Sequence, residues 1–157
     1  MGHEPDRYGP PHFDFHFYGV DTAAVAAVDC QDATQPDPAT VPAGWAPPVP
    51  PGVPDPTVMC VPHMGYHALP LTEFSGPGQF QAGAFDQVMV AGFYRGQLTF
   101  IEPMVTLAAL ERKSDFVLPV PRPRLGRPTR YPTTFKGTYD AGTDSYTLTF
   151  SSFEFRD

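Results

Sequence analysis

The chain has 157 residues, enough for one domain with a core of its own, and we treat residues 1–157 as a single β-rich domain. Its formal net charge of −7 argues against nucleic acid or an anionic membrane as the main partner. Its 21 prolines exclude long helices and uninterrupted central strands wherever they fall. No stretch approaches the ~18 apolar residues of a membrane span, and residues 1–8 carry no apolar signal segment. As written, the sequence predicts a cytoplasmic protein, whereas a processed precursor would be exported.

Residues 12–20 read as the first strand. Successive side chains of a strand point to opposite faces, so His12, Asp14 and His16 share one face. Phe13, Phe15 and Phe17 then share the other face, where they suit a core. Same-face neighbours lie roughly 7 Å apart, and we expect the two imidazoles to converge on one cation.

A short helix and a long proline-rich loop follow this strand. Asp21 and Thr22 offer a cap to a helical turn over residues 23–28. Nine of the 21 residues in 36–56 are proline, which predicts polyproline II and turns, with Trp45 anchored in the body of the protein. Cys30 and Cys60 flank this loop and allow one disulfide, but for a sequence without a leader we favour two free thiols.

Two hairpins are predicted in the second half of the chain. Residues 85–90 and 97–101 form the first, joined by a turn at 92–96, with Pro103 ending its second strand. Thr106 caps a short helix over 107–112. Residues 135–139 and 146–150 form the second hairpin, with its turn at 140–144. The predicted fold is mainly antiparallel β, a barrel or a sandwich, with one or two short helices and the long proline-rich loop.

A histidine and a glutamate from later strands complete a candidate metal site. His67 follows a glycine that permits close backbone approach, and Glu102 ends an apolar strand. With His12 and His16 they form a cupin-like set of three histidines and one glutamate, which suits Fe, Mn, Cu, Ni or Zn. The candidate catalytic residues around this metal are Asp14, Tyr18 and Tyr66. Asp14 would orient an imidazole, or would itself bind the metal and leave His12 as a general base.

Two other functions remain open from the sequence alone, and neither uses a catalytic metal. The first is a non-catalytic homo-oligomer whose histidine-rich face packs between subunits or holds a structural ion. The second is a metal-free barrel that binds or isomerises an apolar small molecule, with Asp14 or Glu102 as acid or base. A Gly-x-Ser-x-Gly elbow and a glycine-rich phosphate loop are both absent from the sequence.

Five blocks occur in an order that is distinctive: Gly2–Pro5, Pro11–Tyr18, Met64–His67, Gly92–Gly96 and Glu102–Thr106. Together they resemble the TTHB210-like family of bacterial proteins, a domain of unknown function. The resemblance implies a β-rich domain that assembles into higher oligomers and is often exported, and it places the His and Glu positions in one shared framework. Relatives carry further β-forming sequence ahead of the first block, so the resemblance implies a minimal member or a trimmed start.

Overall fold

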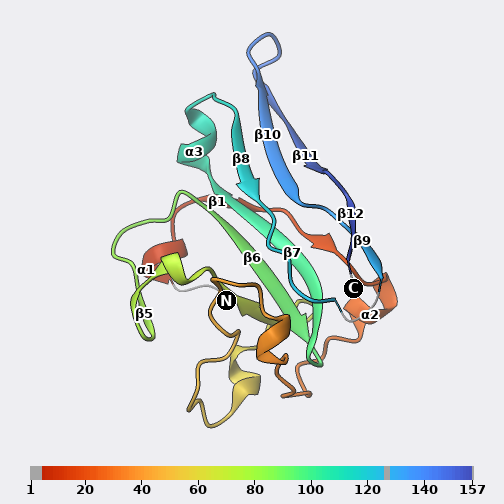
Figure 1. Ribbon diagram of the computed structural model, residues 1–157. Helices are drawn as coiled ribbons and strands as arrows, with labels where there is room; N and C mark the ends of the chain where they lie inside the picture. Colours follow the sequence, from red (N-terminus) through yellow and green to blue (C-terminus); the bar gives the residue numbers. More distant parts are fainter. Residues whose placement is uncertain (1–4, 126–127, 157) are drawn as a thin grey trace.

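The computed structural model describes residues 5–125 and 128–156, which fold mainly into antiparallel β-structure (Figure 1). The strands are β1 His12–Asp14, β2 Phe17–Tyr18, β3 Tyr66–Ala68, β4 Phe74–Gly76, β5 Gln79–Phe80, β6 Gln87–Tyr94, β7 Gln97–Thr106, β8 Phe116–Pro119, β9 Thr129–Tyr131, β10 Thr134–Asp140, β11 Ser145–Ser151 and β12 Glu154–Arg156. The helices are α1 Pro5–Tyr8, α2 Thr22–Ala26 and α3 Leu107–Glu111, with 3-10 turns at Pro38–Thr40, Pro56–Met59 and Leu71–Glu73.

The strands form two principal sheets. The larger sheet has the order β1-β7-β6-β3, and β2 also pairs with β7. The second sheet has the order β11-β10-β8, and the pairs β12-β9 and β4-β5 are separate. The prediction of a mainly antiparallel β fold is confirmed, and the open sheets within the described ranges make it sandwich-like rather than a barrel.

Both predicted hairpins form, but the first extends beyond its expected end. Strand β7 continues through Pro103 to Thr106 and pairs with β6, so the prediction that Pro103 ends it is wrong. Pro103 accepts a hydrogen bond from the backbone N–H of Phe15 but has no N–H to return. We attribute the break between β1 and β2, at residues 15 and 16, to this missing donor.

The predicted caps begin both short helices. The Asp21 carboxylate accepts a hydrogen bond from the Ala24 N–H at 2.8 Å, and α2 follows it. The Thr106 hydroxyl oxygen accepts from the Ala109 N–H at 3.1 Å, and α3 follows. These caps satisfy backbone donors that a short helix leaves without an internal partner.

The phenylalanine side of the first strand packs against the second sheet. We call this side of the larger sheet the aromatic face; it carries Phe13, Phe15, Phe17, Ile101 and Val105. The ring centroid of Phe135 on β10 lies 6.1 Å from that of Phe15, and Phe150 on β11 lies 5.1 Å from Phe17. The main core of the protein therefore lies between the two sheets.

The opposite side, which we call the histidine face, carries His12, Asp14, His16, Phe100, Glu102 and Met104. Irregular segments cover it rather than a second sheet, and its apolar part is a smaller cluster around Tyr8, Val90 and Met104. Arg7 and Glu73 form a buried ion pair at 2.6 Å, and Tyr8 donates a 2.7 Å hydrogen bond to the same carboxylate. This network fastens α1 to the segment that leads into β4.

The proline-rich segment crosses from one face to the other at the β3 edge of the larger sheet. Trp45 packs against the core and donates a hydrogen bond from its indole N–H to the Met89 carbonyl at 3.3 Å. The next residue, Ala46, donates its N–H to the Leu69 carbonyl at 2.8 Å. The tryptophan anchor predicted from the sequence is confirmed.

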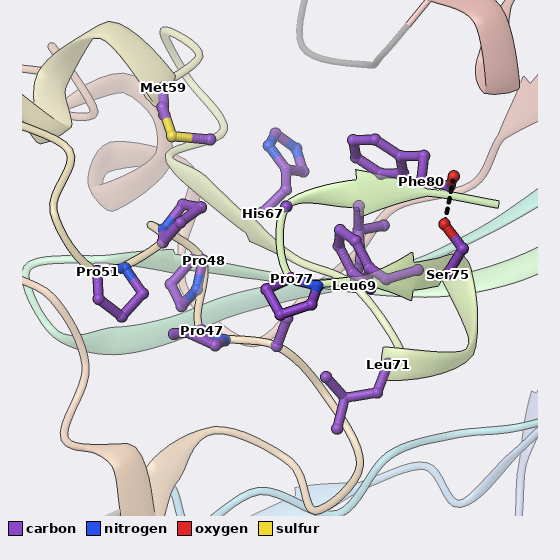
Figure 2. Close-up of a pocket in the computed structure, with 15 residues that line it drawn as sticks. Pro47, Pro48, Pro51, Met59, His67, Leu69, Leu71, Ser75, Pro77 and Phe80 are labelled. Carbon is purple, nitrogen blue, oxygen red and sulfur yellow. Dashed lines mark hydrogen bonds between the residues drawn. The ribbon is translucent and has the colours of Figure 1, made fainter.

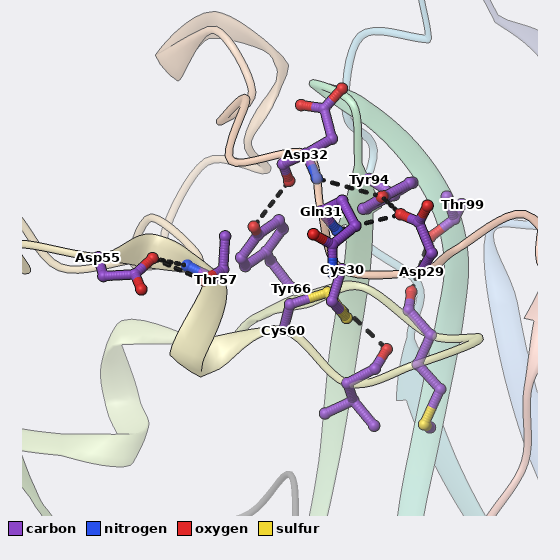
Figure 3. Close-up of a disulfide and its surroundings, with 12 residues drawn as sticks. Asp29, Cys30, Gln31, Asp32, Asp55, Thr57, Cys60, Tyr66, Tyr94 and Thr99 are labelled. Atoms are coloured by element: carbon purple, nitrogen blue, oxygen red, sulfur yellow. Dashed lines mark hydrogen bonds between the residues drawn. A yellow bond between two sulfur atoms is a disulfide. The ribbon is translucent and has the colours of Figure 1, made fainter.

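Cys30 and Cys60 form a disulfide, so the expectation of two free thiols is wrong (Figure 3). The segments it joins are also held by tyrosines: Tyr66 donates to the Asp32 carbonyl at 2.8 Å, and Tyr94 donates to the Asp29 carboxylate at 2.5 Å. The Cα atoms of the two cysteines lie 5.6 Å apart, an ordinary separation for a disulfide. Sequence spacing alone did not show that the two loops meet.

The described helices are all short. None of them has the length and apolar character needed to cross a membrane.

Candidate functional site

The candidate site is centred on Glu102, a carboxyl buried on the histidine face. The strand register places Phe17 opposite Ile101 and Asp14 opposite Met104, which sets His16 beside Glu102. His67 comes from β3, on the far side of β6, where it pairs with Gly92. Strand β3 and the link between β1 and β2 thus bring two imidazoles to one carboxyl on β7.

The two carboxyl oxygens of Glu102 face different histidines. Oε1 lies 3.5 Å from Nε2 of His16, and Oε2 lies 3.9 Å from Nε2 of His67. Both distances are longer than a hydrogen bond. The Glu102 oxygens and the His16 Nε2 are buried and make no hydrogen bond to the described residues. Buried polar atoms are rarely left this way, so this cluster is a candidate for function.

A glycine and a phenylalanine position the two imidazoles. The Phe100 ring lies 4.9 Å from the ring of His16 and 5.5 Å from that of His67, measured between centroids. A Cβ atom at Gly92 would collide with this ring, so only glycine leaves room for it there. The ring of Tyr18 stacks on His16 at 5.7 Å. Phe100 therefore separates the two histidines while Glu102 lies near both.

Burial controls the ionisation of the cluster. It raises the pKa of Glu102 to about 8, with a further contribution from the negative charge of Asp14. Burial also lowers the pKa of His16, against a smaller opposing effect of Asp14. The pKa of Tyr18 is raised by burial and by Glu102. At neutral pH, Glu102 is therefore mostly a neutral carboxylic acid beside a neutral His16.

The predicted metal site of three histidines and one glutamate is wrong. Over residues 5–125 and 128–156, no group of three or more His, Cys, Asp or Glu side chains is arranged to hold a metal ion. His12 lies four residues from His16, about 13 Å along an extended strand, which is too far for a shared ligand position. Instead, Nε2 of His12 lies 3.3 Å from Oδ1 of Asp14, and its ring contacts that of Phe85. The oxygens of Glu102 also face separate imidazoles rather than one common point.

The residues predicted to be catalytic lie in different places. Asp14 is on the histidine face beside His12, and Tyr18 contacts His16, so both lie near Glu102. Tyr66 is fully buried with its hydroxyl on the Asp32 carbonyl, in the disulfide region and away from the cluster. Roles in catalysis for these three residues stay predictions. His3 and Glu4 of the first resemblance block lie outside the described residues.

A large apolar pocket lies beside the cluster (Figure 2). Its volume is about 980 Å³. One wall is the proline-rich segment, with Pro47, Pro48, Pro50 and Pro51, together with Met59 of the 3-10 turn that follows it. The other wall is the β4-β5 hairpin, with Phe74 and Phe80. Leu69, Leu71 and His67 connect the two walls. Among these lining residues His67 is the titratable one, and it joins the pocket to Glu102.

Sequence reasoning identified the cluster residues but missed the pocket. Phe74 and Phe80 belong to short strands around a Gly-Pro-Gly turn, where no periodic pattern marks a binding wall. A run of prolines containing a tryptophan anchor does show that the segment docks on the body. It does not show that the docked segment leaves space beneath it.

No family model, no curated protein and no solved structure matches this chain.

Proposed function

We propose that this protein binds an apolar small molecule in the pocket between the proline-rich segment and the β4-β5 hairpin. The volume and lining of the pocket carry this proposal: about 980 Å³ enclosed mainly by proline, leucine, phenylalanine and methionine side chains. Small-molecule sites are typically concave and apolar, with a few placed polar groups. Here the polar side chains are Ser75 and His67, and His67 is backed by Glu102.

The rigidity of the walls supports this function. The disulfide holds Cys60, the residue directly after the 3-10 turn that carries Met59. The Arg7–Glu73 ion pair fixes the segment before Phe74. Each wall is thus tied to another segment of the fold, one by a covalent bond and the other by a buried ion pair. A pocket formed in advance loses less conformational entropy when its ligand binds.

The test is binding of a neutral amphiphile, 4-phenylbutanol, measured by calorimetry and by the fluorescence of Trp45, the single tryptophan. We expect saturable binding to one site per chain, weakened several-fold in the variant Leu69→Asn, which places an amide in the pocket. The matched control is Leu107→Asn, at an exposed position on α3. No saturable binding, or equal binding by both variants, would reject the proposal. Treatment with a chelator is expected to leave the affinity unchanged.

We also propose that the protein works in an oxidising compartment. The Cys30–Cys60 disulfide supports this, because such bonds persist outside the reducing cytosol. Mass spectrometry of the protein recovered from its native compartment, after alkylation of free thiols, would test it; two alkylated cysteines would count against it. The homo-oligomer and the family resemblance expected from the sequence stay predictions.

A further inference from the structure

Glu102 is a buried carboxyl that, within residues 5–125 and 128–156, is not paired with a lysine or arginine. Its side chain is 0% exposed. The described lysines and arginines that form ion pairs all do so with carboxylates other than Glu102. The imidazoles of His16 and His67 lie 3.5 and 3.9 Å from its two oxygens. Buried acids are normally hydrogen-bonded or paired with a permanent cation; among the described residues this one makes no hydrogen bond, and its close partners are histidines rather than a lysine or arginine.

The pocket reaches this carboxyl through His67. That histidine lines the pocket, and its Nε2 lies 3.9 Å from Oε2 of Glu102. A ligand group held against His67 is therefore close to Glu102, whose side chain is fully buried. Charge interactions are much stronger there than at the protein surface.

Resting on the proposed function, we propose that the ligand is an organic amine: an apolar body carrying one ammonium group, which lies at His67 and is attracted by Glu102. The ammonium supplies the positive charge that the buried carboxyl lacks. Binding then favours the ionised form of Glu102, whose proton leaves to solvent. His16, whose side chain is 20% exposed on the other side of Glu102, lies toward the solvent.

Charge and lining both favour a cation over an anion. No lysine or arginine is among the residues lining the pocket, so a carboxylate or phosphate ligand would lack a permanent positive partner there. Asp14 adds negative charge near Glu102, and the whole chain carries −7. The rings of Phe74 and Phe80 offer aromatic faces, which attract ammonium groups.

The titratable groups around Glu102 determine how its ionisation responds to a bound charge. They are His16 from the link between β1 and β2, Tyr18 from β2, Asp14 from β1 and His67 from β3. Val90 on β6 is its register partner and carries no charge. Among these, Glu102 and Asp14 are the acidic groups, and an ammonium at His67 offsets both.

The experiment compares three probes with the same body: 4-phenylbutylamine, 4-phenylbutanol and 4-phenylbutanoate. Affinities are measured by calorimetry at pH 7.5 for the wild type, Glu102→Gln and the control Glu111→Gln, which changes an exposed carboxyl on α3. We expect the wild type to bind the amine at least about tenfold more tightly than the alcohol, and the carboxylate most weakly. In Glu102→Gln the amine should lose its advantage, so that amine and alcohol bind with similar affinity.

The outcomes separate the two proposals. If none of the three probes binds the wild type, the proposed function fails. If the alcohol binds but the amine binds no more tightly, or if the carboxylate binds best, the pocket stands and the amine proposal is overturned. Should Glu102→Gln not fold, the order of the three affinities in the wild type still decides the question. An unchanged preference for the amine in a folded Glu102→Gln also overturns it.

Discussion

The two faces of the larger sheet use the same strands for different purposes. The aromatic face packs phenylalanines and aliphatic side chains against the β8-β10-β11 sheet. The histidine face, one residue away along each strand, buries a carboxyl between two imidazoles and leaves a pocket of about 980 Å³ nearby. A regular sheet covers the first face, whereas α1, the β4-β5 hairpin and a proline-rich segment cover the second.

This difference shows how the cover of a sheet determines what the sheet can do. Two sheets pack with interdigitating side chains and few voids. Irregular segments follow their own turns and prolines, so they span a surface without filling it. The space left beneath them, together with the polar residues that the alternation places there, makes the histidine face the one suited to binding.

The largest expected effect comes from opening the aromatic face. Phe135 is 1% exposed and contacts the rings of Phe15 and Phe150. We expect Phe135→Ala to lower the free energy of unfolding by about 3–5 kcal/mol, measured by urea denaturation, because it leaves a cavity in the main core. The control is Phe155→Ala, at a residue 72% exposed, with a change within about 0.5 kcal/mol. Equal losses in the two variants would contradict this division between core and surface.

The next effect tests how the irregular cover is held. Replacing both Cys30 and Cys60 by serine removes a cross-link between residues 30 positions apart. The loop-entropy model predicts a loss of about 3–4 kcal/mol in the free energy of unfolding. A reducing agent added to the wild type should reproduce the loss, and it should leave the double variant unaffected. An unchanged urea midpoint in the double variant would show that the cover is held by other contacts.

A smaller effect appears in the dependence of stability on pH. The pKa of Glu102 is about 8 in the folded chain and near 4.5 in the unfolded chain, so between these values the folded chain binds the extra proton. The free energy of unfolding therefore falls as the pH rises through this window, by at most about 1.4 kcal/mol per pH unit. The lowered pKa of His16 acts in the opposite direction below about pH 6.5.

The clearest measurement thus lies between about pH 6.5 and 8. Urea denaturation across this range should show falling stability in the wild type and little of that fall in Glu102→Gln. The control Glu111→Gln should follow the wild type. Parallel curves for wild type and Glu102→Gln would mean that Glu102 titrates normally.

The smallest effect on stability is expected at the mouth of the pocket. Met59 is 41% exposed and lines the proline-rich wall. Met59→Gln should change the free energy of unfolding by no more than about 0.5 kcal/mol, since the side chain is half in solvent. It should nevertheless weaken binding of 4-phenylbutanol by a few-fold in calorimetry. Val58→Gln, its neighbour at 74% exposure and not among the lining residues, should bind as the wild type does.

Local patterns in the sequence were sufficient for many elements. Asp21 and Thr106 are capping residues followed by good helix formers, and both helices begin there. The alternation of residues 12–17 correctly assigned the phenylalanines to one face and the histidines to the other. Gly65, expected to allow close backbone approach, lies against the Phe93 carbonyl with φ of 98°. These features depend on neighbours in the chain, which the sequence displays directly.

What the tertiary structure decided depends on distances between segments. The sequence by itself determined the β class, the caps and the faces, because propensity and alternation act over a few residues. It did not determine that His16, Glu102 and His67 meet while His12 lies apart, because register and strand order set those distances. The disulfide and the pocket depend likewise on how loops of irregular geometry pack across the sheet. Such packing follows from the whole fold, and no local period encodes it.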